Sequence, residues 1–236
     1  MAVQVYDNDF APPAALMADP ARAAMLRALL PGRALAAGEL ARVAGIGAAT
    51  ASFHLTKLLD GGLVAVAKQG RHRYYQLAGH EVAAALEAIA LISPGVPVRS
   101  LHQSREAVAL AQARTCYDHL AGRAGVELLD ALLREELLVE SAPDAFDVTR
   151  AGDAKLASFC INVCEIRQSR REFAGSCIDW TQRRRHLNGA LGAAITARLF
   201  AVGWIDRGSR RRSVRVTEAG AEGLAGTFGM SYLAEE

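Results

Sequence analysis

The sequence contains no uninterrupted apolar run long enough to span a bilayer, although 51% of its 236 residues are hydrophobic. Its N-terminal segment also lacks the basic start, apolar stretch and small-residue cleavage site of an export signal. We therefore expect a cytoplasmic protein with no membrane partner. Its length allows one large or two small domains with a substantial buried core.

Cysteine is scarce and unevenly placed. The four cysteines all lie from the middle of the chain onward, at Cys116, Cys160, Cys164 and Cys177. A cytoplasmic setting disfavours structural disulfides, so we expect reduced thiols.

Motifs of common enzyme classes are also missing. The sequence has no glycine-rich phosphate loop, no nucleophile elbow and no zinc-hydrolase spacing. We therefore expect that the chain is not an enzyme. The alternative is a thiol- or metal-dependent hydrolase built on Cys116 with His119 and on the cluster at 179–186.

Charge is segregated by region, which the net charge of +2 conceals. Residues 126–165 carry nine acidic groups against three basic ones, whereas residues 179–215 carry nine arginines against Asp179 and Asp206. We expect the acidic hairpin at 141–147 not to touch DNA, although it can meet a basic surface on another subunit.

A series of short helices is present near the N-terminus. Asp19 before Pro20 marks a helix start, because proline is tolerated in the first turn and the aspartate caps free amides. A second helix is expected over 37–44, and Gly45-Ile46-Gly47 follows it with a tight turn that glycine permits. A third helix, over 48–61, completes a predicted helix-turn-helix.

The helix expected over 48–61 has two different faces. Its apolar residues recur at helical spacing, at Ala51, Leu55, Leu58 and Leu59. The other face mixes small, hydroxyl and basic groups that suit a DNA groove. Expected DNA contacts from it are Ala49, Thr50, Ser52, Phe53, His54, Thr56 and Lys57.

Two residues of this helix have specific expectations. Phe53 can press on a thymine methyl, or it can pack against the first helix or a dimer partner. His54 is expected to donate to a backbone phosphate and not to act as a catalytic base, because no partner carboxylate lies near it in sequence.

A basic hairpin is expected next. Residues 63–66 lead into the stretch 68–73, and the chain returns through 74–77. Lysine and arginine neutralise phosphates and fix the register while a helix reads base edges. Lys68, Arg71 and Arg73 are therefore expected DNA contacts, and the whole segment predicts a winged helix-turn-helix.

Three stretches carry a family resemblance: ADPARAAMLRALL, ELARVAGIGAATASFHLTKLLDGGLV and RHRYYQL. They resemble the arsenic-repressor (ArsR/SmtB) family of bacterial transcriptional regulators, over residues 15–92. The resemblance implies a homodimer that binds double-stranded operator DNA and represses a promoter until an effector lowers its affinity.

The family's metal sites are not evident in the sequence. The thiol site of the family would lie around 35–39, where this chain has no cysteine. The alternative metal site of the family would lie on the helix after the wing, where this chain offers only His80 and Glu87 as ligands. We therefore expect control to come from the second half of the chain.

Two prolines and a glycine between Ile92 and Arg99 interrupt helical periodicity. They predict a boundary between a DNA-binding domain at 1–95 and a C-terminal effector or dimerisation domain at 100–236.

An internal repeat follows this boundary. Residues 137–139 with 146–152 parallel residues 203–205 with 214–220. Thr149 and Thr217 are placed to cap the helices that follow each hairpin. We expect a mainly α fold with small β-hairpin wings: the N-terminal winged helix-turn-helix and a C-terminal domain of two winged-helix-like repeats, joined by a long helix over 151–174.

The second half offers three candidate sites. A second basic wing at Arg210, Arg211 and Arg212 can contact phosphates or be a solvated hairpin. Metal or thiol sensing can involve Cys116, His119, Cys160, Cys164 and Cys177. Cys160 and Cys164 are four residues apart and would lie on the same face of a helix. There they can bind a soft metal ion together, or they can be small buried hydrophobic residues.

A third group of residues would be costly to bury unpaired: Arg114, Asp118, Asp179, Trp180, Arg184 and His186. They can form an internal ion-pair network that locks the repeats together, or line an effector pocket.

The sequence as a whole predicts a sequence-specific DNA-binding regulator, a repressor, with an effector acting on its C-terminal domain. A regulator that senses metal or thiol oxidation through its C-terminal cysteines is the first alternative. Another is a winged-helix module that binds protein instead of DNA.

Overall fold

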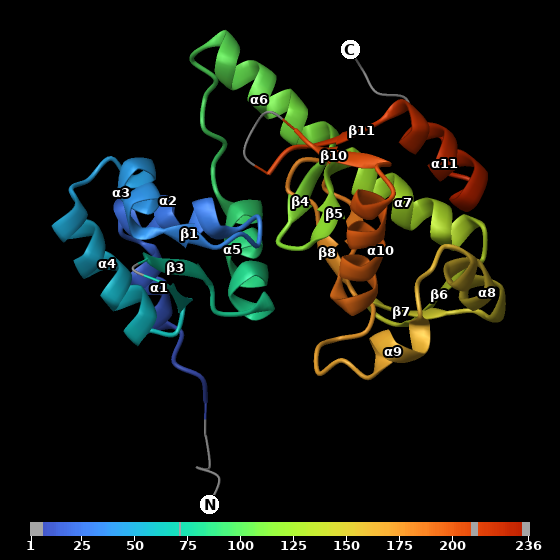
Figure 1. Ribbon diagram of the computed structural model, residues 1–236, viewed down its shortest axis with the longest axis horizontal. Coiled ribbons are helices and arrows are strands. Elements are labelled where there is room, and N and C mark those ends of the chain that lie inside the picture. The colour runs from blue at the N-terminus through green and yellow to red at the C-terminus, as the bar shows by residue number, and fades with distance from the viewer. Residues whose placement is uncertain (1–6, 71, 209–211, 233–236) are drawn as a thin grey trace, which may run out of the picture. The chain divides into compact units, whose positions relative to one another are not determined.

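The computed structural model describes residues 7–70, 72–208 and 212–232. The chain divides into two units, Met1–Leu86 and Glu87–Glu236, each of which is described by itself (Figure 1). Within the described ranges, no helix has both the length and the apolar character needed to cross a membrane.

The first unit begins with four helices. They are α1 (Ala11–Met17), α2 (Pro20–Leu29), α3 (Ala37–Ala44) and α4 (Ala48–Asp60). Asp19 caps α2 as predicted, because its side chain accepts from the Arg22 backbone N–H at 2.9 Å. Gly45 ends α3 with a φ of 67°, a left-handed conformation that favours glycine, and α4 starts after Gly47. The predicted helix-turn-helix is confirmed.

A small antiparallel sheet accompanies these helices, in the order β1-β3-β2. Its strands are β1 (Leu35–Ala36), β2 (Val64–Gln69) and β3 (His72–Leu77). The β2–β3 hairpin pairs Val64 with Leu77 and Lys68 with Arg73, and it forms the predicted wing. Helix α5 (His80–Ile92) follows.

The core of the first unit fixes the orientation of α4. Met25, Leu26 and Leu29 of α2 are fully buried, as are Leu40 of α3 and Leu55 of α4. Because the apolar face of α4 is used in this packing, its opposite face points to solvent.

The second unit contains two segments with the same order of hairpin, helix, hairpin and helix (Figure 1). After α6 (Leu101–Gln112), the first has β4 (Arg114–Cys116), β5 (His119–Ala121), α7 (Gly122–Arg134), β6 (Leu138–Ala142), β7 (Ala145–Val148) and α8 (Arg150–Ser158). After α9 (Val163–Arg167), the second has β8 (Ser176–Ile178), β9 (Arg185–Leu187), α10 (Gly189–Ala201), β10 (Ile205–Arg207), β11 (Val214–Val216) and α11 (Glu218–Phe228). The expected likeness of each segment to a winged helix stays a prediction.

The two segments are connected reciprocally. The Thr115 N–H, on β4, donates to the Arg212 carbonyl just before β11, and the Phe146 N–H, on β7, donates to the Ala174 carbonyl just before β8. Strand β5 packs against α10, and β9 packs against α7. Each segment therefore completes part of the other, and both share one hydrophobic core.

The prediction of one long helix over 151–174 is wrong. Helix α8 ends at Ser158, and Cys160 takes a left-handed φ of 59°. Asn162 then caps α9, which begins at Val163 and ends at Arg167. The predicted caps are confirmed, since Thr149 and Thr217 accept from the amides of Gly152 and Gly220.

A buried ion pair connects the first hairpin of each segment. Arg114 of β4 and Asp179, just after β8, are both fully buried, with Nη2 and Oδ2 2.8 Å apart. Asp179 also accepts from the backbone N–H groups of Gly122, Thr181 and Gln182 at 2.7 to 3.0 Å. Burial opposes ionisation, but Arg114 and these donors hold the pKa of Asp179 well below its usual range.

We predict that Arg114→Met lowers the free energy of unfolding of the second unit by about 3 to 5 kcal/mol, because it leaves the Asp179 carboxylate buried without its cation. Both tryptophans, Trp180 and Trp204, belong to this unit, so urea denaturation followed by their fluorescence measures the change. Arg105→Met, on the exposed surface of α6, is the control. A loss below about 1 kcal/mol would show that the pair is dispensable.

Candidate functional site

The exposed face of α4 contains the residues expected to read DNA. Ala49, Thr50, Ser52, Phe53, Thr56 and Lys57 are all exposed. Ala51, Leu55 and Leu58 on the other face are buried. The helix therefore presents the predicted set of side chains to solvent, apart from His54.

The chemistry of this face is set by three hydroxyls, those of Thr50, Ser52 and Thr56, with an aromatic ring and an amine. Ser52 donates to the Ala48 carbonyl and Thr56 to the Ser52 carbonyl, each at 3.0 Å. Both hydroxyl oxygens therefore keep lone pairs that can accept from a base amino group. Phe53 is 58% exposed, with the Lys57 ammonium 4.5 Å from its ring centroid.

His54 is placed differently from expectation. Its side chain is only 13% exposed, and Nδ1 lies 3.4 Å from Arg22 Nη1 and 3.7 Å from Asp19 Oδ1. A carboxylate distant in sequence thus lies beside it, and the ring packs against the start of α2. This placement argues against the expected phosphate contact.

The wing presents two described cations. Lys68 of β2 and Arg73 of β3 face each other in register, and both are exposed. Arg71, the third expected wing contact, lies outside the described residues.

Of the second basic wing, only Arg212 is described, and Arg210 and Arg211 lie outside the described residues. The Arg212 guanidinium is mostly buried, forms an ion pair with Glu87 and donates to the Thr115 carbonyl. This internal role argues against the expected phosphate contact by Arg212.

The second unit also brings two cysteines and two histidines together. Cys116, His119, Cys177 and His186, here called the Cys–His cluster, each offer a ligand atom, and these atoms all lie within 4.8 Å of one another. Cys116 and His119 face each other on the β4–β5 hairpin, and Cys177 and His186 do so on β8–β9. The two imidazoles are stacked, with centroids 5.2 Å apart.

The electrostatics of the cluster favour a thiolate. A hydrogen bond from the Cys116 thiol lowers the pKa of Cys177 to about 3 despite burial, with His119 contributing in the same direction. That hydrogen bond and burial raise the pKa of Cys116. Burial and the charge of His119 lower the pKa of His186 to about 3. A thiolate is the form of cysteine that binds metals and reacts with oxidants.

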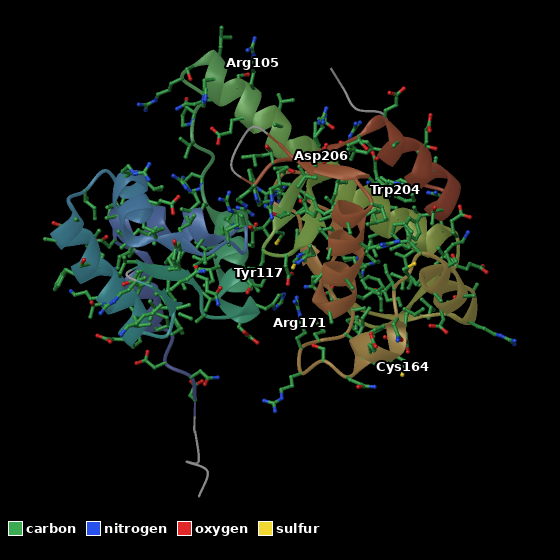
Figure 2. All side chains as sticks on the ribbon, viewed as in Figure 1. Arg105, Tyr117, Cys164, Arg171, Trp204 and Asp206 are labelled. Atoms are coloured by element: carbon green, nitrogen blue, oxygen red, sulfur yellow. The ribbon has the colours of Figure 1, made fainter. Side chains whose placement is uncertain are left out.

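Cys160 and Cys164 do not belong to this cluster. Both are exposed, one in the turn after α8 and the other on α9. Figure 2 shows Cys164 well apart from Tyr117, which marks the turn between β4 and β5. The expectation that these two cysteines share one helix face is wrong, because the helix is interrupted between them.

The residues expected as an ion-pair network or effector pocket form mainly ion pairs. Arg114 pairs with Asp179 and lies 4.7 Å from the Trp180 ring centroid, and Asp118 pairs with Arg171 at 2.6 Å. Arg184 is an exposed partner of Asp130, and His186 belongs to the Cys–His cluster. A hollow of about 330 Å³ lies elsewhere, along residues 160–166 and α10.

Comparisons with known proteins agree with the geometry of the first unit. A family model described as a helix-turn-helix domain matches residues 17–67. The chain is also 43% identical over 205 residues to the uncharacterized HTH-type transcriptional regulator YdfF of Bacillus subtilis (strain 168), an alignment that covers 87% of this chain and 90% of that protein. The chain belongs to the family of HTH-type transcriptional regulators.

Two similar solved structures each cover about a third of this chain. NolR from Sinorhizobium fredii is 29% identical, covers 36% of this chain and 85% of its own, and has a TM-score of 0.34. The homodimeric winged helix-turn-helix DNA-binding domain of Mb0332 from Mycobacterium bovis is 30% identical, covers 35% and 75%, and has a TM-score of 0.33.

Two glutamates at the positions where the resemblance would put a metal site have other partners. Glu87, on the helix after the wing, is 5% exposed and is occupied by its ion pair with Arg212. Around 35–39 the chain has no cysteine, and Glu39 accepts from the Ala36 backbone N–H at 3.0 Å. The Cys–His cluster lies elsewhere, in the second unit.

Sequence reasoning missed His186 as a member of the Cys–His cluster. A signal was available, because Cys-Tyr-Asp-His-Leu-Ala-Gly at 116–122 resembles Cys-Ile-Asp at 177–179 followed by His-Leu-Asn-Gly at 186–189. Residues 180–185 interrupt the second copy and hide the likeness.

Proposed function

We propose that the regulator is a homodimer that binds double-stranded operator DNA through α4 and the wing, as a repressor. Residues 1–95 form the DNA-binding domain, and an effector acts on residues 100–236. The observation that carries this proposal is an exposed α4 face, which lies inside the matched helix-turn-helix domain, followed directly by a wing that exposes the cations Lys68 and Arg73.

The α4 face suits a major groove. Ser52 and Thr56 offer acceptor oxygens to base amino groups, and small residues such as Ala49 allow close approach. The exposed ring of Phe53 can contact a thymine methyl, while Lys57 reaches a phosphate or a guanine edge. Direct reading by these side chains would provide sequence preference.

The wing supplies affinity that does not depend on sequence. Lys68 and Arg73 are exposed on facing strands, so both can lie along a phosphate backbone. Such contacts fix the register of a reading helix without specifying bases.

Exposed apolar side chains on α5 support a homodimer. Ile89 and Ile92, three residues apart on this helix, are exposed although they are large and apolar. Groups of exposed apolar side chains often mark an interface. Two copies of α4 would then read two half-sites of a palindromic operator.

We infer that control acts through the second unit, and an alignment with the HTH-type relative that extends beyond the first unit supports this inference. The 205 aligned residues exceed the 86 of the first unit, so the likeness includes much of the second. The Cys–His cluster favours a metal or thiol effector over a larger organic ligand.

We predict that Lys68→Ala with Arg73→Ala weakens binding to all DNA sequences. The slope of log affinity against log salt should fall by about one for each phosphate contact that is lost. Fluorescence anisotropy measures this slope on a duplex from upstream of the regulator's own gene and on a scrambled duplex.

Arg105→Ala with Arg150→Ala removes two exposed cations from the second unit and is the matched control. This control should retain the parent slope. If the wing variant retains it as well, the wing does not contact phosphates.

We predict that Phe53→Ala lowers the preference for the upstream duplex over the scrambled one by roughly 1 kcal/mol, about fivefold. Thermal stability should hardly change, because the ring is exposed. Phe10→Ala removes another exposed ring and should leave the preference intact. Equal loss on both duplexes would exclude base reading by Phe53.

A further inference from the structure

Two hairpins converge in the second unit, and each supplies one cysteine and one histidine from directly opposed strand positions. Cys116, His119 and His186 are at most 3% exposed, and Cys177 is half-buried. Two sulfurs and two imidazoles thus meet inside the protein, within 4.8 Å.

We propose that the Cys–His cluster binds one divalent transition-metal ion of the zinc class. Two thiolates and two imidazoles form a donor set typical of tetrahedral zinc. With bonds of about 2.0 to 2.3 Å, the ligand atoms of a tetrahedral site lie about 3.3 to 3.8 Å apart. Binding therefore requires the widest separations in the cluster to close by about 1 Å.

The carboxylates around the cluster support metal binding. Asp118 Oδ1 lies 3.4 Å from His119 Nδ1, and Asp179 Oδ2 lies 3.8 Å from His186 Nδ1. A carboxylate at Nδ1 orients an imidazole so that its Nε2 can bind a metal. Asp118 is held in turn by Arg171, and Asp179 by Arg114.

His186 gives an independent indication of a ligand. Its side chain is 1% exposed, and among the described residues neither ring nitrogen has a hydrogen-bond partner. A buried imidazole without partners is costly, and a metal bond at Nε2 would remove that cost. Asn188 also donates to Cys177 Sγ at 3.0 Å, a contact suited to a metal-bound thiolate.

The surroundings of the two histidines are reciprocal. A Cβ added to Gly125 of α7 would lie 3.5 Å from His186 Cβ, and one added to Gly192 of α10 would lie 3.3 Å from His119 Cβ. The glycines that end the two motifs, Gly122 and Gly189, have φ values of 74° and 78°. Each segment thus builds half of the site in the same way, and a metal ion would tie the two segments together.

A disulfide between Cys116 and Cys177 is the competing outcome. It would leave His186 Nε2 buried without a hydrogen bond, whereas a metal ion uses all four side chains. We therefore favour the metal.

The first test is the metal content of the full chain, purified under reducing conditions and freed of loosely bound ions by gel filtration. Elemental analysis should find about one ion per chain. After removal by a chelator, Co²⁺ should restore that stoichiometry, with a thiolate-to-cobalt charge-transfer band and the visible bands of tetrahedral cobalt. No retained ion together with no thiolate-to-cobalt band would overturn the proposal, as would a Cys116–Cys177 disulfide in protein that takes up no metal.

The ligand test compares two cysteine changes. Cys177→Ser should weaken Co²⁺ binding by about 100-fold or more and remove most of the charge-transfer band. Cys160→Ser with Cys164→Ser alters the two exposed cysteines and should bind Co²⁺ as the parent does. The reverse pattern would overturn the proposal.

A second variant keeps the test decisive if Cys177→Ser does not fold. Asp118 is 32% exposed, so Asp118→Asn should fold, with about 10- to 100-fold weaker Co²⁺ binding and unchanged stoichiometry. Parent-like affinity in this folded variant would contradict the proposed orientation of His119. Because metal content is measured on the free protein, its failure would leave the DNA-binding proposal standing.

Discussion

A guanidinium and a carboxylate that water cannot reach must neutralise each other's charge and complete each other's hydrogen bonds. The second unit is organised around one such pair. Arg114 and Asp179 are both fully buried and belong to different hairpins. The same carboxylate accepts from the first residue of α7 and lies 3.8 Å from His186 Nδ1. The relative position of the hairpins, and with it the Cys–His cluster, therefore depends on this pairing.

The first unit depends on a different constraint, which is apolar packing. Leucines of α2, α3 and α4 fix the orientation of the reading helix, and no side chain of its exposed face is needed for that core. Core and recognition surface are thus separate sets of residues on α4. This separation allows a DNA-reading face to change its sequence without loss of the fold.

The sequence predicted the first unit well because its signals are local. Asp19 caps α2 and Gly45 ends α3, so both boundaries follow from neighbouring residues. The neighbours of His54 could not be predicted, because Asp19, which lies beside it in space, caps another helix. The broken helix at 151–174 was missed because apolar periodicity outweighed the cap at Asn162, which is visible in the sequence.

The Cys–His cluster was predictable only in part. Residue type identified Cys116, His119 and Cys177, but it also included Cys160 and Cys164 and assigned His186 to another site. Periodicity within one element does not indicate which distant hairpins pack together. That arrangement comes from tertiary contacts, here between β5 and β9 and the helices of the opposite segment.

We propose that this chain reads operator DNA as a two-fold symmetric dimer. DNase I footprinting of the DNA upstream of its own gene should then show two protected half-sites whose centres lie about one helical turn, or a multiple of it, apart. Protection spread evenly along the fragment, or no protection even at low salt, would contradict it.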